Sequence, residues 1–289
     1  MFRKVRERQP SGGSGIGAGY YLCLTVFPLL EAGSFALAVA LWDQSVLAAS
    51  LCLILAALGL NYSIHISFHE MMHQRIFKSR VLDGILRLIN SLWMGVPFDG
   101  YCLHHENHHR YNNSIEDYST TWREGPDGPV PQHWLLYSLS WPVHVARALR
   151  VTRIEETAGR VTNRMRWNKR EKAFLLIAWM LFGWYSPTLL GMYILVTYLG
   201  WTLSAVHNFG QHPPIDLGAH ETTSVYSPTF NLLFMNNGLH REHHQNPGKR
   251  WSHLVPQPDA DSRWTIPRPH LFQPLLGPSL TGGGPGLRP

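Results

Sequence analysis

The chain has 289 residues, of which 45% are hydrophobic and 15% are charged, and its formal net charge is +6. Ordinary soluble domains contain about 25% charged residues, so this composition favours a membrane protein. The basic residues cluster at the N-terminus and over residues 147–172, beside apolar stretches. That placement is typical of the cytoplasmic flanks of membrane spans, so no nucleic acid is expected as a partner. The three cysteines have no metal-type spacing and imply no disulfide framework.

The first part of the chain predicts a transmembrane hairpin. Residues 1–18 are basic and then rich in Gly and Ser, and we expect them to form a disordered cytoplasmic lead. Residues 19–42 contain Glu31 as their only charge, and residues 44–64 contain none. Each stretch reaches the roughly 20 apolar residues that cross a bilayer, and only a tight turn separates the two.

A second uncharged stretch, residues 173–206, predicts another hairpin with its turn at residues 185–187. Four spans place both termini on one side of the membrane. The basic clusters flank that same side, and the positive-inside rule makes it cytoplasmic. The sequence therefore predicts an all-α, multi-pass integral membrane protein, with four transmembrane helices arranged as two hairpins.

Two amphipathic segments are expected at the membrane surface, and the chain divides into a membrane domain and a C-terminal tail. Residues 81–96 and 133–150 show an amphipathic helical pattern. Such helices lie on the membrane or form a cap at its surface, and we expect a cytoplasmic cap. Residues 19–254 are predicted to form one membrane domain, and residues 255–289 a tail rich in Pro and Gly.

Seventeen histidines are the anomaly of the sequence, because many of them fall into three short boxes. The first box is His-Glu-Met-Met-His, whose two histidines are four residues apart and share one face of a helix. The second box, His-Glu-Asn-His-His, and the third, His-Arg-Glu-His-His, each gather three imidazoles on one side of a helical turn. The box histidines are His69, His73, His105, His108, His109, His240, His243 and His244.

These boxes predict a metal centre on the cytoplasmic side. Imidazoles buried together without partners would be costly, and they would repel one another when protonated. A metal ion removes both problems, because neutral imidazole is a common ligand of transition metals. One zinc ion takes about four ligands, so the number of histidines fits two ions. Spacing alone excludes no particular metal.

The three boxes resemble those of the membrane fatty-acid desaturase superfamily, which also includes alkane hydroxylases and carotenoid hydroxylases and ketolases. HEMMH, HENHH and HREHH occur in the family's order, separated by membrane hairpins as in the family. Asp117 after the second box and Trp251 after the third also match. The resemblance covers about residues 19–254. It implies that the eight box histidines bind two iron ions and that O2 is a co-substrate.

The family usually has one further histidine before the third box. Gln211-His212 resembles the form found in many bacterial members, whereas His207-Asn-Phe-Gly resembles the form in stearoyl-type desaturases. We favour His212 as the ninth ligand and keep His207 as the alternative. Carboxylates near the boxes are candidates for hydrogen-bond partners that orient the rings, with simple solvation as the other interpretation. They are Glu106, Asp117 and Glu242.

The resemblance implies an oxidoreductase that introduces a C=C bond into a fatty-acyl chain. The alternative is a membrane di-iron hydroxylase or ketolase acting on an acyl, alkane or carotenoid substrate. HEMMH also matches the HExxH motif of zinc proteases, a remote alternative that leaves the other two boxes unexplained. We expect an apolar substrate tunnel, with Trp93, Met94 and Phe98 as candidate lining residues.

The expected partners are an electron donor and a carrier of the acyl group. No flavin or haem motif is visible, so electrons must come from a donor such as a ferredoxin or a b-type cytochrome with its reductase. Residues 147–172 are a candidate docking patch for an acidic donor, although membrane orientation explains this basic cluster equally well. The acyl group is expected on a carrier protein, on coenzyme A or in a lipid.

Overall fold

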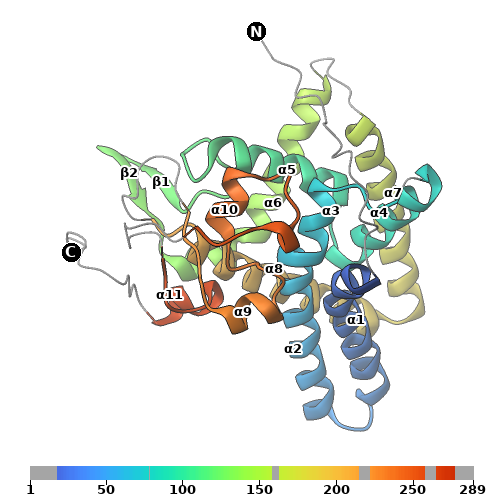
Figure 1. The fold of residues 1–289 in the computed structure, drawn as a ribbon. Coiled ribbons are helices and arrows are strands. Elements are labelled where there is room, and N and C mark those ends of the chain that lie inside the picture. The colour runs from blue at the N-terminus through green and yellow to red at the C-terminus, as the bar shows by residue number, and fades with distance from the viewer. Residues whose placement is uncertain (1–17, 78, 158–162, 215–221, 258–264, 277–289) are drawn as a thin grey trace.

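The computed structural model describes residues 18–77, 79–157, 163–214, 222–257 and 265–276. These residues are mostly helical, as the sequence predicts (Figure 1). One small antiparallel hairpin was not expected. It consists of β1 (Trp122–Gly125) and β2 (Gly128–Pro131) and follows the second histidine box. The predicted N-terminal lead lies outside the described residues, apart from its last residue.

The first predicted hairpin is present as α1 (Ala18–Leu41) and α2 (Val46–Tyr62), which project together from the body of the molecule (Figure 1). Ser45 begins α2, because its side-chain oxygen accepts a hydrogen bond from the backbone N–H of Ala48 at 3.3 Å. The helical path then continues through a π-helical turn, η1 (Ser63–Phe68), into α3 (His69–His73). The first histidine box is therefore the end of a long apolar helix.

The second predicted hairpin corresponds to α7 (Asn163–Tyr185) and α8 (Pro187–Gln211). Ser186 separates them and caps α8, with its side-chain oxygen accepting from the N–H of Leu189 at 3.3 Å. Pro187 stands at the first helical position, where its missing N–H costs nothing. The tight turn places α7 and α8 side by side.

Three helical segments are long and apolar enough to cross a membrane: Leu24–Leu41, Val46–His73 and Pro187–Gln211. The bent pair of α4 (Arg80–Met94) and α5 (Phe98–Tyr111) would be a fourth. Among the described residues, α7 does not qualify, because its first half is charged and its apolar part, residues 173–185, is shorter than the roughly 20 residues required. The protein thus has the helices of a membrane protein, while four spans and a cytoplasmic cap stay predictions.

Both amphipathic segments form helices. The first is α4 (Arg80–Met94), which ends at Gly95 in the left-handed conformation. After a sharp bend of 80°, α5 (Phe98–Tyr111) carries the second histidine box. The other amphipathic segment is α6 (Trp134–Thr157), which packs against α8. Together these helices surround the histidine boxes.

The C-terminal part of the chain completes the body of the protein. It contains α9 (Pro228–Leu233), α10 (His240–Gln245), η2 (Trp251–His253), η4 (His270–Phe272) and α11 (Gln273–Leu276). Residues 265–276 lie inside the predicted tail, yet they pack on α8, and the N–H of Ile266 donates to the carbonyl of Ser224 at 3.0 Å. Part of that segment therefore belongs to the core.

A close approach of α1 and α2 generates a stability prediction. A Cβ atom at Gly59 would lie 2.8 Å from the backbone nitrogen of Glu31, whereas a Cβ at Gly33 would meet nothing within 4 Å. We expect Gly59→Ala to push the helices apart and to cost about 1–3 kcal/mol, the usual cost of overpacking. Thermal unfolding in detergent should show a lower midpoint for Gly59→Ala. The control Gly33→Ala should keep or raise the wild-type midpoint, because alanine is the better helix former and nothing obstructs its Cβ atom. Equal midpoints for the two variants would contradict the prediction.

Candidate metal centre

The π-helical turn before α3 orients the first box. In this turn the carbonyl oxygen of His65 accepts a hydrogen bond from Nδ1 of His69 at 3.2 Å and another from the side-chain amide of Asn237 at 3.0 Å. Because Nδ1 of His69 donates, its Nε2 carries the lone pair. That Nε2 is buried and has no hydrogen-bond partner. It faces the other box histidines, with the His105 and His243 rings 4.3 and 4.5 Å away.

The first group of imidazoles combines all three boxes. Its potential ligand atoms all lie within 4.8 Å of one another. Neighbouring Nε2 atoms approach closely: 2.9 Å between His73 and His105, 2.9 Å between His105 and His109, and 3.1 Å between His109 and His243. The members of this group are His69, His73, His105, His109 and His243.

The second group combines the second and third boxes with the end of α8. Its ligand atoms also lie within 4.8 Å of one another. The Nε2 of His240 is 3.0 Å from that of His212 and 3.1 Å from that of His244. The members are His108, His212, His240 and His244. His212, favoured from the sequence, thus joins the group, whereas His207 belongs to neither group among the described residues.

The two groups lie directly beside each other. The rings of His109, in the first group, and His244, in the second, have centroids 4.4 Å apart. On both α5 and α10, histidines four residues apart share a group, while the histidine at the intermediate position belongs to the other group. Consecutive residues on a helix point about 100° apart, so each box can serve two neighbouring positions.

The donor set fits metal binding. Imidazole nitrogens bind ions such as zinc at about 2.0–2.1 Å, so two nitrogens at right angles around one ion are about 2.9 Å apart. The Nε2 separations in both groups are 2.9–3.1 Å. In addition, the buried Nε2 of His69, which faces the first group, has no hydrogen-bond partner. These residues therefore fit two adjacent ions, one in each group.

Burial keeps the ligands in the form that binds metal. Loss of solvation, together with repulsion from neighbouring imidazoles, lowers the pKa of His212, His240, His243 and His244 well below the usual 6.5. At neutral pH these rings are uncharged. Their lone pairs are then available to an ion.

Asp117 orients one of these rings. Its Oδ2 accepts a hydrogen bond from Nδ1 of His108 at 2.8 Å and another from the N–H of Asn113 at 2.7 Å, while Oδ1 accepts from the N–H of Ser119 at 2.7 Å. With Nδ1 donating, Nε2 of His108 is left for the second group. Asp117 is almost fully buried, so solvent does not compete for its hydrogen bond with His108.

The other two candidate carboxylates are placed differently. Glu106 is exposed on α5. Glu242 is buried, and it accepts hydrogen bonds from the hydroxyls of Ser224 and Tyr226, both at 2.7 Å, and from the N–H of Gln257 at 3.0 Å. Glu242 therefore fixes α10 against the segments on either side of it.

Glu70, within the HEMMH box, is also buried, and its Oε2 accepts from the backbone N–H of Trp251 at 3.3 Å. The Trp251 ring in turn stacks on His243 with centroids 4.4 Å apart and meets His69 edge-on at 5.0 Å. Glu70 thus holds an aromatic cover over the first group. This engagement, with five imidazoles in the group, does not match the two-histidine arrangement of a HExxH protease.

A separate trio of buried histidines adjoins the centre. His207 stacks on His65 with centroids 4.1 Å apart, and its ring is 5.8 Å from that of His270. Nε2 of His270 lies 3.2 Å from the carbonyl of Thr223, and burial lowers its pKa to about 3. Sequence reasoning missed His270, because it stands alone in a segment expected to be irregular.

A cavity of about 620 Å³ reaches the first group; we refer to it as the His73 cavity. Of the three residues proposed to line a substrate tunnel, Phe98 lines this cavity, Met94 is in the core, and the indole of Trp93 donates to the carbonyl of Pro28. The cavity has both polar and apolar walls. Its lining residues include Met71, Met72, His73, Arg75, Arg80, Leu86, Arg87 and Phe98.

The chain matches a model of a known protein family. The family model described as "Fatty acid desaturase" matches residues 44–267, which is more than half of the chain. The matched range begins just before α2 and contains every histidine of both groups. None of the curated proteins compared with the chain matches it.

Removing the charge of Asp117 should weaken metal binding. Asp117→Asn keeps the shape of the side chain but loses the carboxylate that accepts from His108, and such partners typically contribute 10–100-fold in metal affinity. We expect the bound metal to be lost at a chelator concentration at least about tenfold lower than for the wild type, as measured by elemental mass spectrometry. The control is Asp127→Asn in the exposed β1–β2 turn. Identical retention in both variants would show that Asp117 does not support the site.

The stability of the metal-free protein should depend on pH. Its buried imidazoles stay neutral in the fold but take up protons in the unfolded chain below about pH 6.5, so stability falls as the pH falls through that value. We expect a lower unfolding midpoint at pH 5.5 than at pH 8. The difference should shrink in the His212→Gln, His240→Gln double variant, which removes two titrating groups. An unchanged difference in that variant would contradict the assignment.

Proposed function

Because the chain belongs to the fatty acid desaturase family, we propose that it is an oxygen-dependent di-iron enzyme that introduces a C=C bond into a fatty-acyl chain. The observation that carries the proposal is the pair of adjoining imidazole groups, five ligands in one and four in the other. A centre with two neighbouring redox-active ions suits the reduction of O2, because both ions can share it. A family whose members are oxidoreductases and a site of this composition point to the same chemistry.

When bound, two iron ions would supply the oxidising power to remove hydrogen from an unactivated methylene group. Desaturation consumes O2, two electrons and two protons, and it yields the double bond and two water molecules. The chain contributes the positions of the ligands. Asp117 and the carbonyl of His65 hold two rings in the tautomer whose Nε2 is free to bind. Trp251 covers the first group and excludes water from that side.

The His73 cavity supports access of substrate to the first group. Apolar walls from Met71, Leu86 and Phe98 suit a hydrocarbon chain, and they lie in the same cavity as His73. Arg80 is exposed at this cavity and suits an anionic end, such as the phosphate of an acyl carrier or coenzyme A. Arg75 is also exposed there, and its Nε lies 3.8 Å from the Oδ1 of Asp83. Arg87 is already paired with Asp83 and Asp99, so it shapes the wall.

The electron donor is part of the proposal. We propose an acidic ferredoxin or b-type cytochrome with its reductase, docking on basic residues within 147–172. Most side chains of this segment lie outside the described residues. The boxes and the termini are proposed to lie on the cytoplasmic side, where such donors reside. Charge reversal in the segment should slow reduction by a donor protein and spare reduction by a small chemical reductant.

The same centre could instead insert oxygen. Hydroxylation begins with the same removal of hydrogen, and the position of the substrate decides whether a second hydrogen is lost or oxygen is inserted. The product therefore distinguishes the desaturase from the hydroxylase. An alkene without added oxygen is expected for the proposed reaction, whereas an alcohol would replace it with the hydroxylase alternative.

The test begins with metal content. Protein purified in mild detergent should contain about two iron ions per chain by elemental mass spectrometry, as the two ligand groups require. The double variant His105→Ala, His240→Ala removes one ligand from each group and should lose both ions. The control is His253→Ala, an exposed histidine outside both groups, which should keep them. Tight binding of a single zinc ion, or metal unaffected by the double variant, would overturn the di-iron proposal.

The iron-loaded protein would then be incubated with acyl substrates, a reductant and O2, and the products analysed by mass spectrometry. Loss of two hydrogens from the acyl chain, dependent on O2 and absent in the double variant, is the expected result. Products that carry oxygen from O2 would replace desaturation with hydroxylation. Full iron occupancy with no acyl product would overturn the acyl substrate class.

A further inference from the structure

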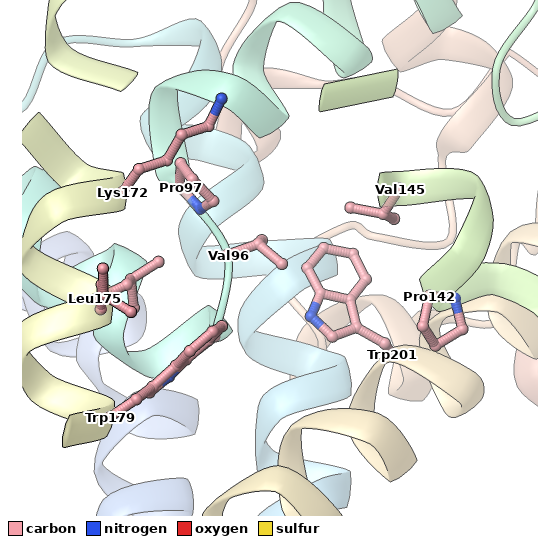
Figure 2. Close-up of a pocket in the computed structure, with 10 residues that line it drawn as sticks. Val96, Pro97, Pro142, Val145, Lys172, Leu175, Trp179 and Trp201 are labelled. Carbon is pink, nitrogen blue, oxygen red and sulfur yellow. The ribbon is translucent and has the colours of Figure 1, made fainter. Parts of the chain in front are cut away.

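A second cavity, which we name the Lys172 cleft, is lined by the turn between α4 and α5 and by residues of α6, α7 and α8. Its volume is about 330 Å³, and it shares no lining residue with the His73 cavity. Figure 2 shows α7 on one side of the cleft, α6 and α8 on the other, and the turn between α4 and α5 at its base. Its walls are almost wholly apolar and include Val96, Pro142, Val145, Leu175, Trp179 and Trp201.

The residues of α7 that line the cleft share one helix face, with a charged side chain at one end and apolar side chains along the rest. Lys172, Leu175, Leu176 and Trp179 recur at three- and four-residue spacing and all line the cleft. Lys172 is the last charged residue before the apolar arm 173–185, and its side chain reaches over the cleft beside Pro97 (Figure 2). The cleft therefore has a cation at one end and an apolar surface about 10 Å long below it.

The cleft is open toward the outer face of α7. Leu176 and Trp179 are 57% and 38% exposed, and the neighbouring Ile177, Met180 and Leu181 are also exposed apolar residues. α7 alone does not qualify as a membrane span, but the sequence predicts residues 173–206 as a membrane hairpin, and on that prediction this face contacts lipid with Lys172 at the level of the head groups. An occupant of the cleft would therefore enter from the bilayer.

We propose that the Lys172 cleft binds one acyl chain of an anionic membrane phospholipid, with Lys172 paired to the phosphate. Apolar walls and a single cation at one end are complementary to a hydrocarbon chain with an anionic head. This site is separate from the proposed reaction, and it also assigns a second role to the last residue of the basic segment 147–172. A bound lipid would fill space that the helices leave open.

The inner wall links the cleft to the metal centre. The indole N–H of Trp201 donates to the carbonyl of Met94 at 2.7 Å, and its ring meets Tyr101 edge-on at 4.8 Å. Tyr101 lies on α5, and Trp201 lies on α8, the helix that leads to His212. A lipid against Trp201 would thus brace two elements that position metal ligands.

The test uses full-length iron-loaded protein in detergent and phosphatidylglycerol with a photoreactive diazirine in its acyl chain. After illumination, peptide mass spectrometry should map the label to the cleft-lining part of α7 and to the α4–α5 turn. Lys172→Gln should reduce this labelling about fivefold, toward the level seen with the same probe on phosphatidylcholine. Lys169→Gln, one turn away on α7 and outside the cleft lining, should leave it unchanged.

A filling variant tests the apolar part. Val145→Trp should abolish labelling inside the cleft, whereas Leu181→Trp adds the same ring on the exposed face of α7 and should leave it intact. Iron content reports whether each variant folds, and Lys172→Gln keeps the test decisive if Val145→Trp does not. Equal labelling in Lys172→Gln and wild type, or label spread evenly over exposed α7, would overturn the proposal. Displacement of the probe by equimolar fatty acid or acyl coenzyme A would assign the cleft to substrate instead. None of these results depends on acyl turnover, so they stand apart from the test of the proposed function.

Discussion

The burial of nine imidazoles in two touching groups is the constraint on which the rest of the structure depends. Each ring must be neutral and must direct a lone pair toward its group. The ligands come from α3, α5, the end of α8 and α10, so four distant parts of the chain must converge within hydrogen-bond distances. A repeated three- and four-residue spacing solves part of this problem, because the second and third boxes each serve both groups, whereas the first box serves the first group alone.

Hydrogen bonds from the backbone and from loop residues orient the rings and fix the helices that carry them. The π-helical turn gives His69 a carbonyl acceptor, Asp117 gives His108 a carboxylate, and Glu242 fixes α10 to its surroundings. The long apolar helices contribute stability mainly by packing, and they also bury Glu31 in α1 and Asn61 near the end of α2. His69, His73 and His212 lie at the ends of the apolar segments, where the chemistry is proposed to occur.

Sequence reasoning reached the boxes and the first hairpin, because these follow from local spacing and from the length of apolar runs. It favoured His212 as the ninth ligand from the family resemblance, and His212 lies in the second group. It treated Glu106, Asp117 and Glu242 alike, because the burial and hydrogen-bond partners of each carboxylate depend on tertiary contacts. It also missed His270, whose role comes from packing of residues 265–276 onto α8. The β1–β2 hairpin has no apolar alternation strong enough to predict two short strands.

The bend between α4 and α5 explains why the protein has two separate cavities. Pro97 lines the Lys172 cleft, while the next residue, Phe98, lines the His73 cavity. Gly95 makes the bend with φ of 68°, and a Cβ there would lie 2.8 Å from the Thr197 side chain on α8. Only glycine meets both conditions without strain. The same turn therefore sets the start of the helix that carries three metal ligands. It also contributes to the wall of the proposed substrate route and to the proposed lipid site. A substitution in this turn should therefore alter the geometry of all three.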